Sequence, residues 1–175
     1  MGNILTQLDH IAGNTIIQFT EADPALLQVD AVVEEQDTYL LLGKSPVILE
    51  TIESFPDLVK KMEQRIRKIP GSVIVKQSRP KRLIAIIFDV EHTPISEVSW
   101  IKEAIQNILK QCEYYKLKTL AMPLLGTSYG KLKEDTIIQL LQDSLIQIRI
   151  DLCWCPEKYW AFWSHNRYRT RGFDR

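Results

Sequence analysis

A short glycine-bearing segment, Leu125-Gly126-Thr127-Ser128-Tyr129-Gly130, carries residue types that suit the binding of a phosphate group. It follows an apolar run at residues 119–124 and precedes apolar residues that recur at helical spacing from Lys133 or Glu134 onward. A strand, a glycine loop and a helix in this order present backbone N–H groups and a helix N-terminus to an anion. The alternative interpretation is a tight turn whose glycines serve only its geometry. The segment alone leaves both open.

Other patterns of chemically active residues do not meet the requirements of known sites. The segment 126–132 is one residue short of a P-loop and has Leu132 where Ser or Thr must bind magnesium, which argues against an ATPase. No dinucleotide-binding glycine fingerprint and no serine-hydrolase elbow is found. Cys153 and Cys155 lie on one face of an expected strand without nearby histidines, which favours buried thiols over a zinc site. We therefore expect neither a metal nor a cofactor.

Strands and helices alternate along the chain, especially after residue 72, which predicts an α/β sandwich with a largely parallel sheet. Apolar runs predict strands at residues 15–20, 29–33, 72–76, 83–90, 119–124 and 146–155, with residues 39–42 also extended. Helical spacing and capping residues predict helices at residues 46–54, 58–68, 96–115, from 133 or 134, and 156–163. Asp57 is expected to cap the second of these. The apolar stripe of the third is expected at Ile101, Ala104, Ile105, Ile108, Leu109 and Cys112. The basic residues at 60–68 are expected on a solvated helix face.

Composition places the chain among globular domains. Its 175 residues suit one domain, and 22 basic residues balance 22 acidic ones, so no net field favours nucleic acid or a membrane. Three cysteines are too few for a disulfide framework, which indicates a reducing, cytoplasmic setting. We expect a single domain at residues 1–164 and a basic, flexible tail at residues 165–175.

Two signatures, in order and on the expected elements, resemble those of the macro domain family. The family's G-D-I-T-x-x-x-V-D-A-I-V-N-A-A-N pattern has a counterpart in ADPALLQVDAVV at residues 22–33, and its I-A-F-P-L-L-G-T-G-x-x-G pattern in LAMPLLGTSYG at residues 120–130. Residues 70–76 and 84–90 resemble the two strands before the family's long helix. The resemblance extends from Gln18 to Trp163.

The resemblance implies a three-layer α/β/α sandwich with a mixed, largely parallel central sheet that binds ADP-ribose or a related nucleotide at the carboxyl ends of its strands, where open parallel sheets bind ligands. It implies that Asp23 accepts a hydrogen bond from adenine, that residues 125–130 offer amides to the diphosphate, and that Tyr159 or Trp160 borders the adenine. The ligand-binding residues that it implies are Asp23, Pro24, Asp37, Gly43, Lys44, Leu125, Gly126, Thr127, Ser128, Tyr129, Gly130, Tyr159 and Trp160.

The chain departs from the family pattern where hydrolytic members carry their chemistry. Glu34-Glu35-Gln36-Asp37 replaces N-A-A-N, so Asp37 stands where an asparagine positions the distal ribose. The first glycine-rich loop becomes residues 42–47, with a single glycine, a proline at Pro46 and no acid at the catalytic position. Pro24 lacks the N–H that the family offers beside its adenine-binding Asp. We therefore predict no catalytic residue.

The sequence analysis thus leads to three hypotheses. The first is a non-hydrolytic module that binds ADP-ribose or a derived nucleotide signal. The second is an ADP-ribosyl hydrolase in which Asp37 or Glu34 acts from an altered position, and the third is a protein-interaction domain that has lost the ligand. Beyond the nucleotide, the expected partners are an ADP-ribosylated protein or another protein chain, and neither a membrane nor nucleic acid.

Overall fold

The architecture was obtained from a computed structural model that describes residues 10–12, 15–17, 27–41, 55–127 and 130–146. The elements in chain order are β1 (His10–Ala12), β2 (Thr15–Ile17), β3 (Ala31–Asp37), α1 (Phe55–Glu63), β4 (Val73–Lys76), β5 (Lys81–Phe88), α2 (Val98–Tyr114), β6 (Leu120–Ala121) and α3 (Glu134–Ile146). Among these residues, no helix is long and apolar enough to cross a bilayer.

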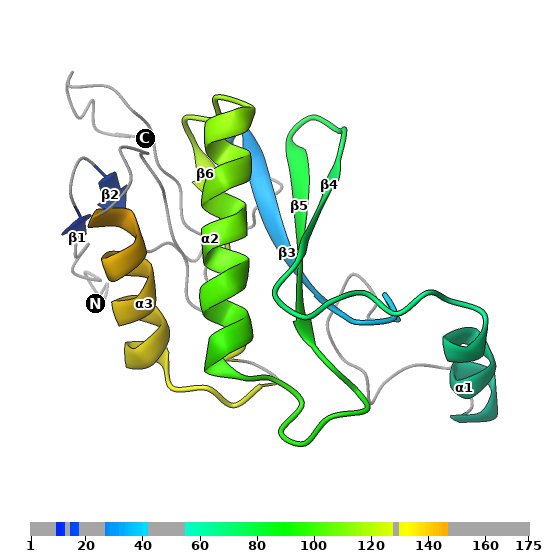
Figure 1. Cartoon of the computed structure of the whole chain (residues 1–175). Coiled ribbons are helices and arrows are strands. Elements are labelled where there is room, and N and C mark those ends of the chain that lie inside the picture. Colours follow the sequence, from blue (N-terminus) through cyan, green and yellow to red (C-terminus); the bar gives the residue numbers. More distant parts are fainter. Residues whose placement is uncertain (1–9, 13–14, 18–26, 42–54, 128–129, 147–175) are drawn as a thin grey trace, which may run out of the picture.

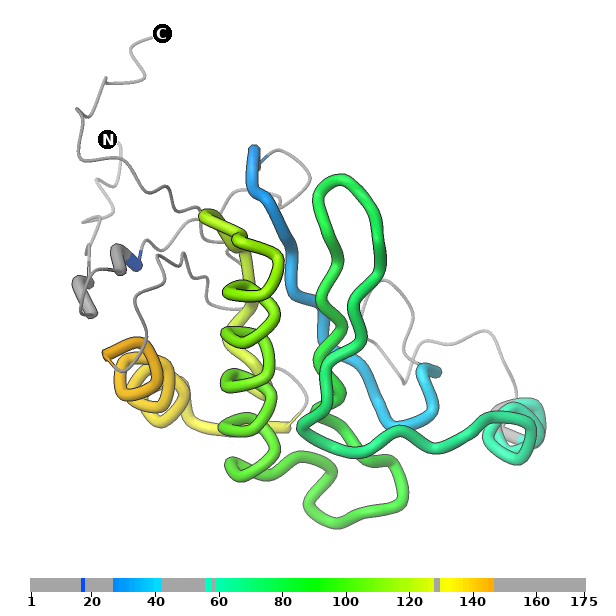
Figure 2. The backbone as a smooth tube through the Cα atoms, turned by 45° about the horizontal axis from the view of Figure 1, so that its top comes forward, coloured from blue at the N-terminus to red at the C-terminus, as the bar shows by residue number. Residues whose placement is uncertain are grey.

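The main sheet has four strands in the order β4-β5-β3-β6 (Figure 1). Strand β3 is parallel to both β5 and β6, whereas β4 is antiparallel to β5, so the sheet is mixed and largely parallel, as predicted. Strands β1 and β2 form a separate antiparallel pair. Helices α2 and α3 lie side by side over one face of the main sheet (Figures 1 and 2). Helix α1 lies apart from both, at the lower right of Figure 1.

Both faces of the main sheet are buried. Ala31, Val33 and Leu83 belong to the core under α2 and α3. Because side chains alternate along a strand, Val32 and Ile84 point to the opposite face, and both are buried there as well. Burial of both faces is typical of a parallel sheet in an α/β sandwich, which confirms the predicted fold class.

Helix α2 buries the apolar stripe that the sequence predicts. Its buried side chains are Ile101, Ala104, Ile105, Ile108, Leu109 and Cys112. Burial raises the pKa of the Cys112 thiol to about 12, with a smaller contribution from the charge of Asp30. The helix ends in a Schellman motif, in which Lys116 has φ 53° and the N–H of Leu117 donates to the carbonyl of Cys112 at 2.8 Å.

Asp30 fixes the beginning of β3 between its two neighbours. Its carboxylate accepts hydrogen bonds from the N–H groups of Lys118 at 2.7 Å and Thr119 at 3.0 Å. Its backbone carbonyl accepts from the N–H of Lys81, at the beginning of β5, at 3.0 Å. One residue therefore ties together the starts of three strands.

Several predicted boundaries are wrong. Strand β3 does not end before Glu34 but continues to Asp37, and residues 38–41, of which 39–41 were expected to be extended, form a turn with Leu40 at φ 57°. The second predicted helix, residues 58–68, begins earlier, at Phe55, because Pro56 fits the first helical turn. It also ends earlier, at Glu63. Asp57 lies in that first turn and is not the cap before it.

The other predicted elements differ less from the structure or lie outside the described residues. Strand β6 is only two residues long, although Met122, Leu124 and Leu125 after it are fully buried. Ile146 ends α3 and does not begin the predicted last strand. The remainder of that strand, the predicted helices at 46–54 and 156–163, and the tail at 165–175 lie outside the described residues.

Candidate functional site

The carboxyl ends of β3 and β5 lie at one edge of the sheet, in the lower part of Figure 1, because these strands are parallel. The chain after β6, which is also parallel to β3, runs toward the same edge, where Gly126 meets Glu35. Loops that follow such ends form the ligand sites of open α/β sheets. The described residues at this edge are the turn 38–41, the loop from Asp89 to Glu97 and the loop between β6 and α3. They form the candidate site.

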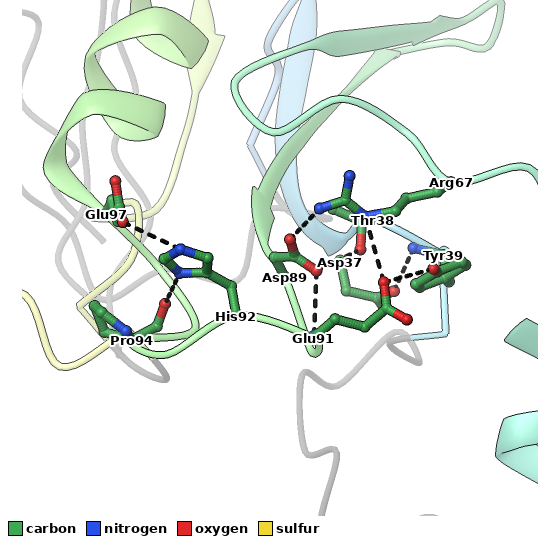
Figure 3. Close-up of polar contacts among 9 residues, drawn as sticks. All are labelled: Asp37, Thr38, Tyr39, Arg67, Asp89, Glu91, His92, Pro94 and Glu97. Carbon is green, nitrogen blue, oxygen red and sulfur yellow. Dashed lines mark hydrogen bonds and ion pairs between the residues drawn. The ribbon is translucent and has the colours of Figure 1, made fainter.

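A polar network centred on Asp89 joins the ends of β3 and β5 (Figure 3). Asp89 is 2% exposed, and its carboxylate accepts hydrogen bonds from the Thr38 hydroxyl at 3.2 Å and from the N–H of Glu91 at 3.2 Å. The guanidinium of Arg67 forms an ion pair with the same carboxylate, which raises the pKa of Arg67 above its ordinary value. A buried charge is thus neutralised and hydrogen-bonded, as burial requires.

Tyr39 and Glu91 extend this network outward. The Tyr39 hydroxyl donates to Glu91 Oε2 at 2.7 Å, and Arg67 Nε lies 3.5 Å from the same oxygen. The hydrogen bond to Glu91 is the main cause that raises the pKa of Tyr39 above its ordinary value, since it favours the protonated phenol. The guanidinium of Arg65 donates to the backbone carbonyls of Tyr39 at 2.9 Å and Leu40 at 2.6 Å.

The sequence predicts that Arg65 and Arg67 lie on the solvated face of a helix, and this prediction is wrong. The helix ends at Glu63, and the two guanidinium groups turn back to hold the end of β3. The N–H of Lys68 also donates to the carbonyl of Thr38 at 2.7 Å. The connection between α1 and β4 is consequently part of the candidate site.

Asp37 is fully buried at the end of β3. Its two carboxylate oxygens accept hydrogen bonds from the N–H groups of Tyr39 and Leu41, each at 2.7 Å. A short acidic side chain that binds amides two and four residues ahead stabilises a turn. Asp37 thus holds the turn 38–41, and the ligand contact implied for it stays a prediction.

The two glutamates before Asp37 also have partners. Glu34 forms a bidentate ion pair with Arg82 on β5, and the hydrogen bond raises the pKa of Arg82. Glu35 Oε1 accepts a hydrogen bond from the N–H of Gly126 at 2.7 Å. A carboxylate of the chain itself therefore occupies one amide of the glycine loop.

The loop between β6 and α3 is tightly packed. Gly126 has φ +75°, and a Cβ there would lie 2.9 Å from Leu132 Cδ1 and 3.0 Å from Ile101 Cδ1. A Cβ on Gly130 would lie 2.5 Å from the carbonyl oxygen of Gly126. Both glycines are therefore required by loop geometry, as the alternative interpretation of this segment holds, and this requirement is compatible with ligand binding.

The described amides of the loop are largely engaged within it. The N–H of Thr127 donates to the carbonyl of Leu124 at 3.2 Å, and its hydroxyl donates to the same carbonyl at 2.8 Å. The N–H of Leu132 donates to the carbonyl of Gly126 at 3.1 Å. Leu125 is fully buried and contributes to the core beneath the loop.

His92 belongs to a separate group on the loop after β5, to one side of the Asp89 network in Figure 3. Its Nδ1 lies 2.9 Å from the carbonyl of Pro94, and its Nε2 lies 3.7 Å from Glu97. Its ring makes an edge contact with Trp100 at 5.2 Å between centroids. Across the described part of the chain, no three metal-ligating side chains converge.

The structure brings five of the implied ligand residues to this edge, namely Asp37, Leu125, Gly126, Thr127 and Gly130. The other eight lie outside the described residues: Asp23, Pro24, Gly43, Lys44, Ser128, Tyr129, Tyr159 and Trp160. Sequence analysis missed the network of Thr38, Arg67, Asp89 and Glu91. The signal available in the sequence was the acid at 89, which closes a run of six apolar residues.

Comparisons with known proteins relate this architecture to macrodomains. No family model matches the sequence, and a comparison with curated protein sequences found no match. The macrodomain of Thermus aquaticus DarG has 21% identity and a TM-score of 0.57, over 79% of this chain and 96% of that chain. The Oceanobacillus iheyensis macrodomain with ADP has 14% identity and a TM-score of 0.64, over 86% of this chain and 87% of that chain.

A mutant of the Oceanobacillus iheyensis macrodomain with ADPR has 15% identity and a TM-score of 0.61, over 86% of this chain and 89% of that chain. These similarities cover most of each protein, although the sequence identities are low. The chain therefore has the macrodomain fold.

Proposed function

We propose that the chain binds ADP-ribose, or a nucleotide derived from it, at the carboxyl edge of its sheet and does not hydrolyse it. One observation carries the proposal: in a macrodomain fold, Gly126, where the glycine loop begins, donates its N–H to Glu35 near the end of β3, an interior strand of the sheet. That arrangement places the small residues of the loop at the edge where parallel sheets bind ligands. Two compared macrodomains have ADP and ADPR, respectively, in their structures.

Calorimetric titration with ADP-ribose, then NAD and free adenosine, tests the binding. We expect a measurable affinity for ADP-ribose and a weaker one for adenosine, because adenosine lacks the diphosphate that would lie against the glycine loop. If none of the three nucleotides binds at millimolar concentration, the proposal is wrong and the interaction-domain hypothesis replaces it.

Glu35 provides a sharper test of where the ligand lies. Its carboxylate contacts the glycine loop and repels an incoming diphosphate, so Glu35→Gln keeps the acceptor oxygen but removes the charge. One unit charge at about 4 Å in water contributes about 1 kcal/mol, so ADP-ribose affinity should rise about fivefold. Glu113→Gln, an equal change at the exposed far end of α2, on the opposite edge of the sheet, should leave the affinity unchanged. Equal effects of the two variants would place the diphosphate away from this loop.

The absence of hydrolysis is supported by the partners of the acids at residues 34–37. A general base has to be within reach of the attacking water. Glu34 pairs with Arg82, Glu35 binds the Gly126 amide, and Asp37 is fully buried and binds two amides. We expect no release of ADP-ribose from a modified protein substrate. Turnover that disappears in Asp37→Asn, at an unchanged melting temperature, would favour the hydrolase hypothesis.

A further inference from the structure

A basic surface lies at the end of the sheet opposite the candidate site, at the top of Figure 1. It is formed by the tip of the β4–β5 hairpin, the last residues of α2 and the segment that leads into β6. We call this surface the amino-end surface. Among the residues that the structure describes, its cations are Lys76, Arg79, Lys81, Lys116 and Lys118, and its acids are Asp30 and Glu113.

Within the described part of the chain, four of these five cations form no ion pair that would stabilise the fold. Among the described residues, Lys76, Arg79, Lys116 and Lys118 are exposed, and none of them forms a salt bridge. The carboxylate of Asp30 binds backbone N–H groups and is not paired with a side-chain cation. The surface therefore has a local excess of positive charge in a chain whose total charge is zero.

A concavity of about 640 Å³ lies in the middle of this surface. Asp30, Gln77, Arg79 and Lys81 provide its polar lining, and Leu117 provides part of its apolar lining. Its lining comes from the hairpin tip, from the two residues before β3 and from Leu117, which follows α2. Its size suits one flat ring system with attached polar groups.

Two tyrosines at the end of α2 stand beside the concavity. Tyr115 is fixed, because Gln77 Nε2 donates to its hydroxyl at 3.1 Å and Lys81 Nζ lies 4.6 Å from its ring centroid. The Tyr114 ring meets the Tyr115 ring edge-on, with 4.8 Å between centroids. Tyr114 is 76% exposed, so its ring is available to solvent and contributes little to the core.

We propose that the amino-end surface binds single-stranded nucleic acid, with phosphates on Arg79, Lys116 and Lys118 and a base stacked on Tyr114. Proteins that bind single strands combine cations that contact the phosphate backbone of the nucleic acid with exposed aromatic rings that stack on its bases, and this surface has both. An acidic protein segment could pair with the cations, but it would gain little from the exposed ring of Tyr114. The surface lies about 25 Å from the candidate site, the length of a strand of seven or eight residues.

Fluorescence anisotropy with a labelled oligothymidylate of about 16 nucleotides tests the proposal on the full chain. Arg79→Glu combined with Lys118→Glu should weaken binding at least about tenfold and reduce the salt dependence of log K by about 1.4, since each neutralised phosphate contributes about 0.7. Tyr114→Ala should weaken binding about tenfold, as expected when one stacked base is lost. Lys102→Glu, an exposed charge reversal at the other end of α2, should change it less than about twofold.

Three controls distinguish binding at the amino-end surface from binding at the tail, at the candidate site, or through charge alone. Serine substitution of the tail arginines Arg167, Arg169, Arg171 and Arg175 should leave binding intact. Saturating ADP-ribose should not displace the oligonucleotide, because the two sites are at opposite ends of the sheet. Heparin, a polyanion without bases, should bind with an affinity that Tyr114→Ala does not change.

The proposal is overturned if the oligonucleotide does not bind, or if the tail variant loses binding while the surface variants keep it. Displacement by ADP-ribose would place the oligonucleotide at the candidate site. If Tyr114→Ala has no effect and heparin competes fully, the surface recognises charge alone and suits an acidic protein partner. Circular dichroism of each variant establishes that the fold is retained, and the high exposure of Tyr114 makes its substitution compatible with folding.

Discussion

Removal of the Asp89 carboxylate should strongly destabilise the fold. Asp89 is buried at the end of β5 and has three partners, namely the Thr38 hydroxyl, the N–H of Glu91 and the guanidinium of Arg67. Asp89→Ala leaves all three without their acceptor. Asp89→Asn keeps an oxygen for Thr38 and Glu91 but presents a neutral amide to Arg67.

The magnitude follows from the burial of the two ionic partners. Breaking a buried ion pair costs about 3–5 kcal/mol, and exposed pairs contribute below about 1 kcal/mol. Asp89 is 2% exposed, but Arg67 is 46% exposed and stays hydrated when its partner is removed. The lower end of the range for buried ion pairs therefore applies. Asp89→Ala should lower the free energy of unfolding by about 3 kcal/mol, and Asp89→Asn should lower it by about 1–2 kcal/mol.

The opposite truncation should be at least as harmful. Arg67→Met leaves the Asp89 carboxylate buried without its counter-ion, so the cost should be about 3 kcal/mol or more. Asp89→Asn added to Arg67→Met should then restore part of the loss, because the uncompensated charge is gone. This rescue is a coupling that independent sites do not show.

Urea unfolding followed by tryptophan fluorescence measures these differences. A loss of about 3 kcal/mol is a large share of the roughly 5–15 kcal/mol of a typical domain and should lower Tm by about 6–12 °C. Glu97→Gln, which removes the half-exposed pair with His92 at 3.7 Å, is the matched control and should cost less than about 0.5 kcal/mol. Equal losses for Asp89→Ala and Glu97→Gln, or strict additivity with Arg67→Met, would refute the reasoning.

Three further predictions concern other described residues. Gly126→Ala should lower the free energy of unfolding by about 2–4 kcal/mol, because φ +75° is strained for alanine and its Cβ would lie 2.9 Å from Leu132 Cδ1. Urea unfolding measures this loss, and a neutral effect would contradict the loop geometry. Tyr39 should remain protonated above pH 10 while the unfolded phenol ionises, so stability should fall as pH rises through that range, and urea titrations of the protein and of Tyr39→Phe should diverge only there. Cys112, buried and with a pKa of about 12, should resist iodoacetamide at neutral pH in the native state and react after unfolding, as peptide mass spectrometry can show.

The elements with strong apolar patterns could be predicted from the sequence. The strand at residues 83–90 was expected from six consecutive apolar residues and is observed as β5, Lys81–Phe88. The α2 stripe was expected from helical spacing and matches the buried residues one for one. In both cases one local pattern determines which side chains face the core, so no distant residue is needed.

The end of β3 could not be predicted because its partners are distant in sequence. Four polar residues, Glu34 to Asp37, normally end a buried strand, yet the ladder with β5 continues through them. Glu34 pairs with Arg82, 48 residues later, and Glu35 accepts a hydrogen bond from the N–H of Gly126, 91 residues later. A local sequence pattern does not show that residues so distant satisfy the polar groups of this strand.

The same reason explains the missed network. Arg67 follows a basic helix and is expected to be solvated when only its neighbours in sequence are considered. Its partner Asp89 lies 22 residues further on, and Thr38 lies 51 residues before Asp89. The family resemblance did indicate the glycine loop and its edge of the sheet, since those residues form one continuous signature.

The position of Asp30 has a consequence for how the chain folds during synthesis. Its carboxylate and amide bind residues 118 and 119, which leave the ribosome long after β3 and β5. Until then β3 has a partner on one side only, and its other side is an open strand edge, which promotes association between chains. A nascent chain arrested before Leu120 should therefore be prone to aggregate, and one extended past α3 should not, which makes the final pairing of β3 with β6 a late step in the folding of this domain.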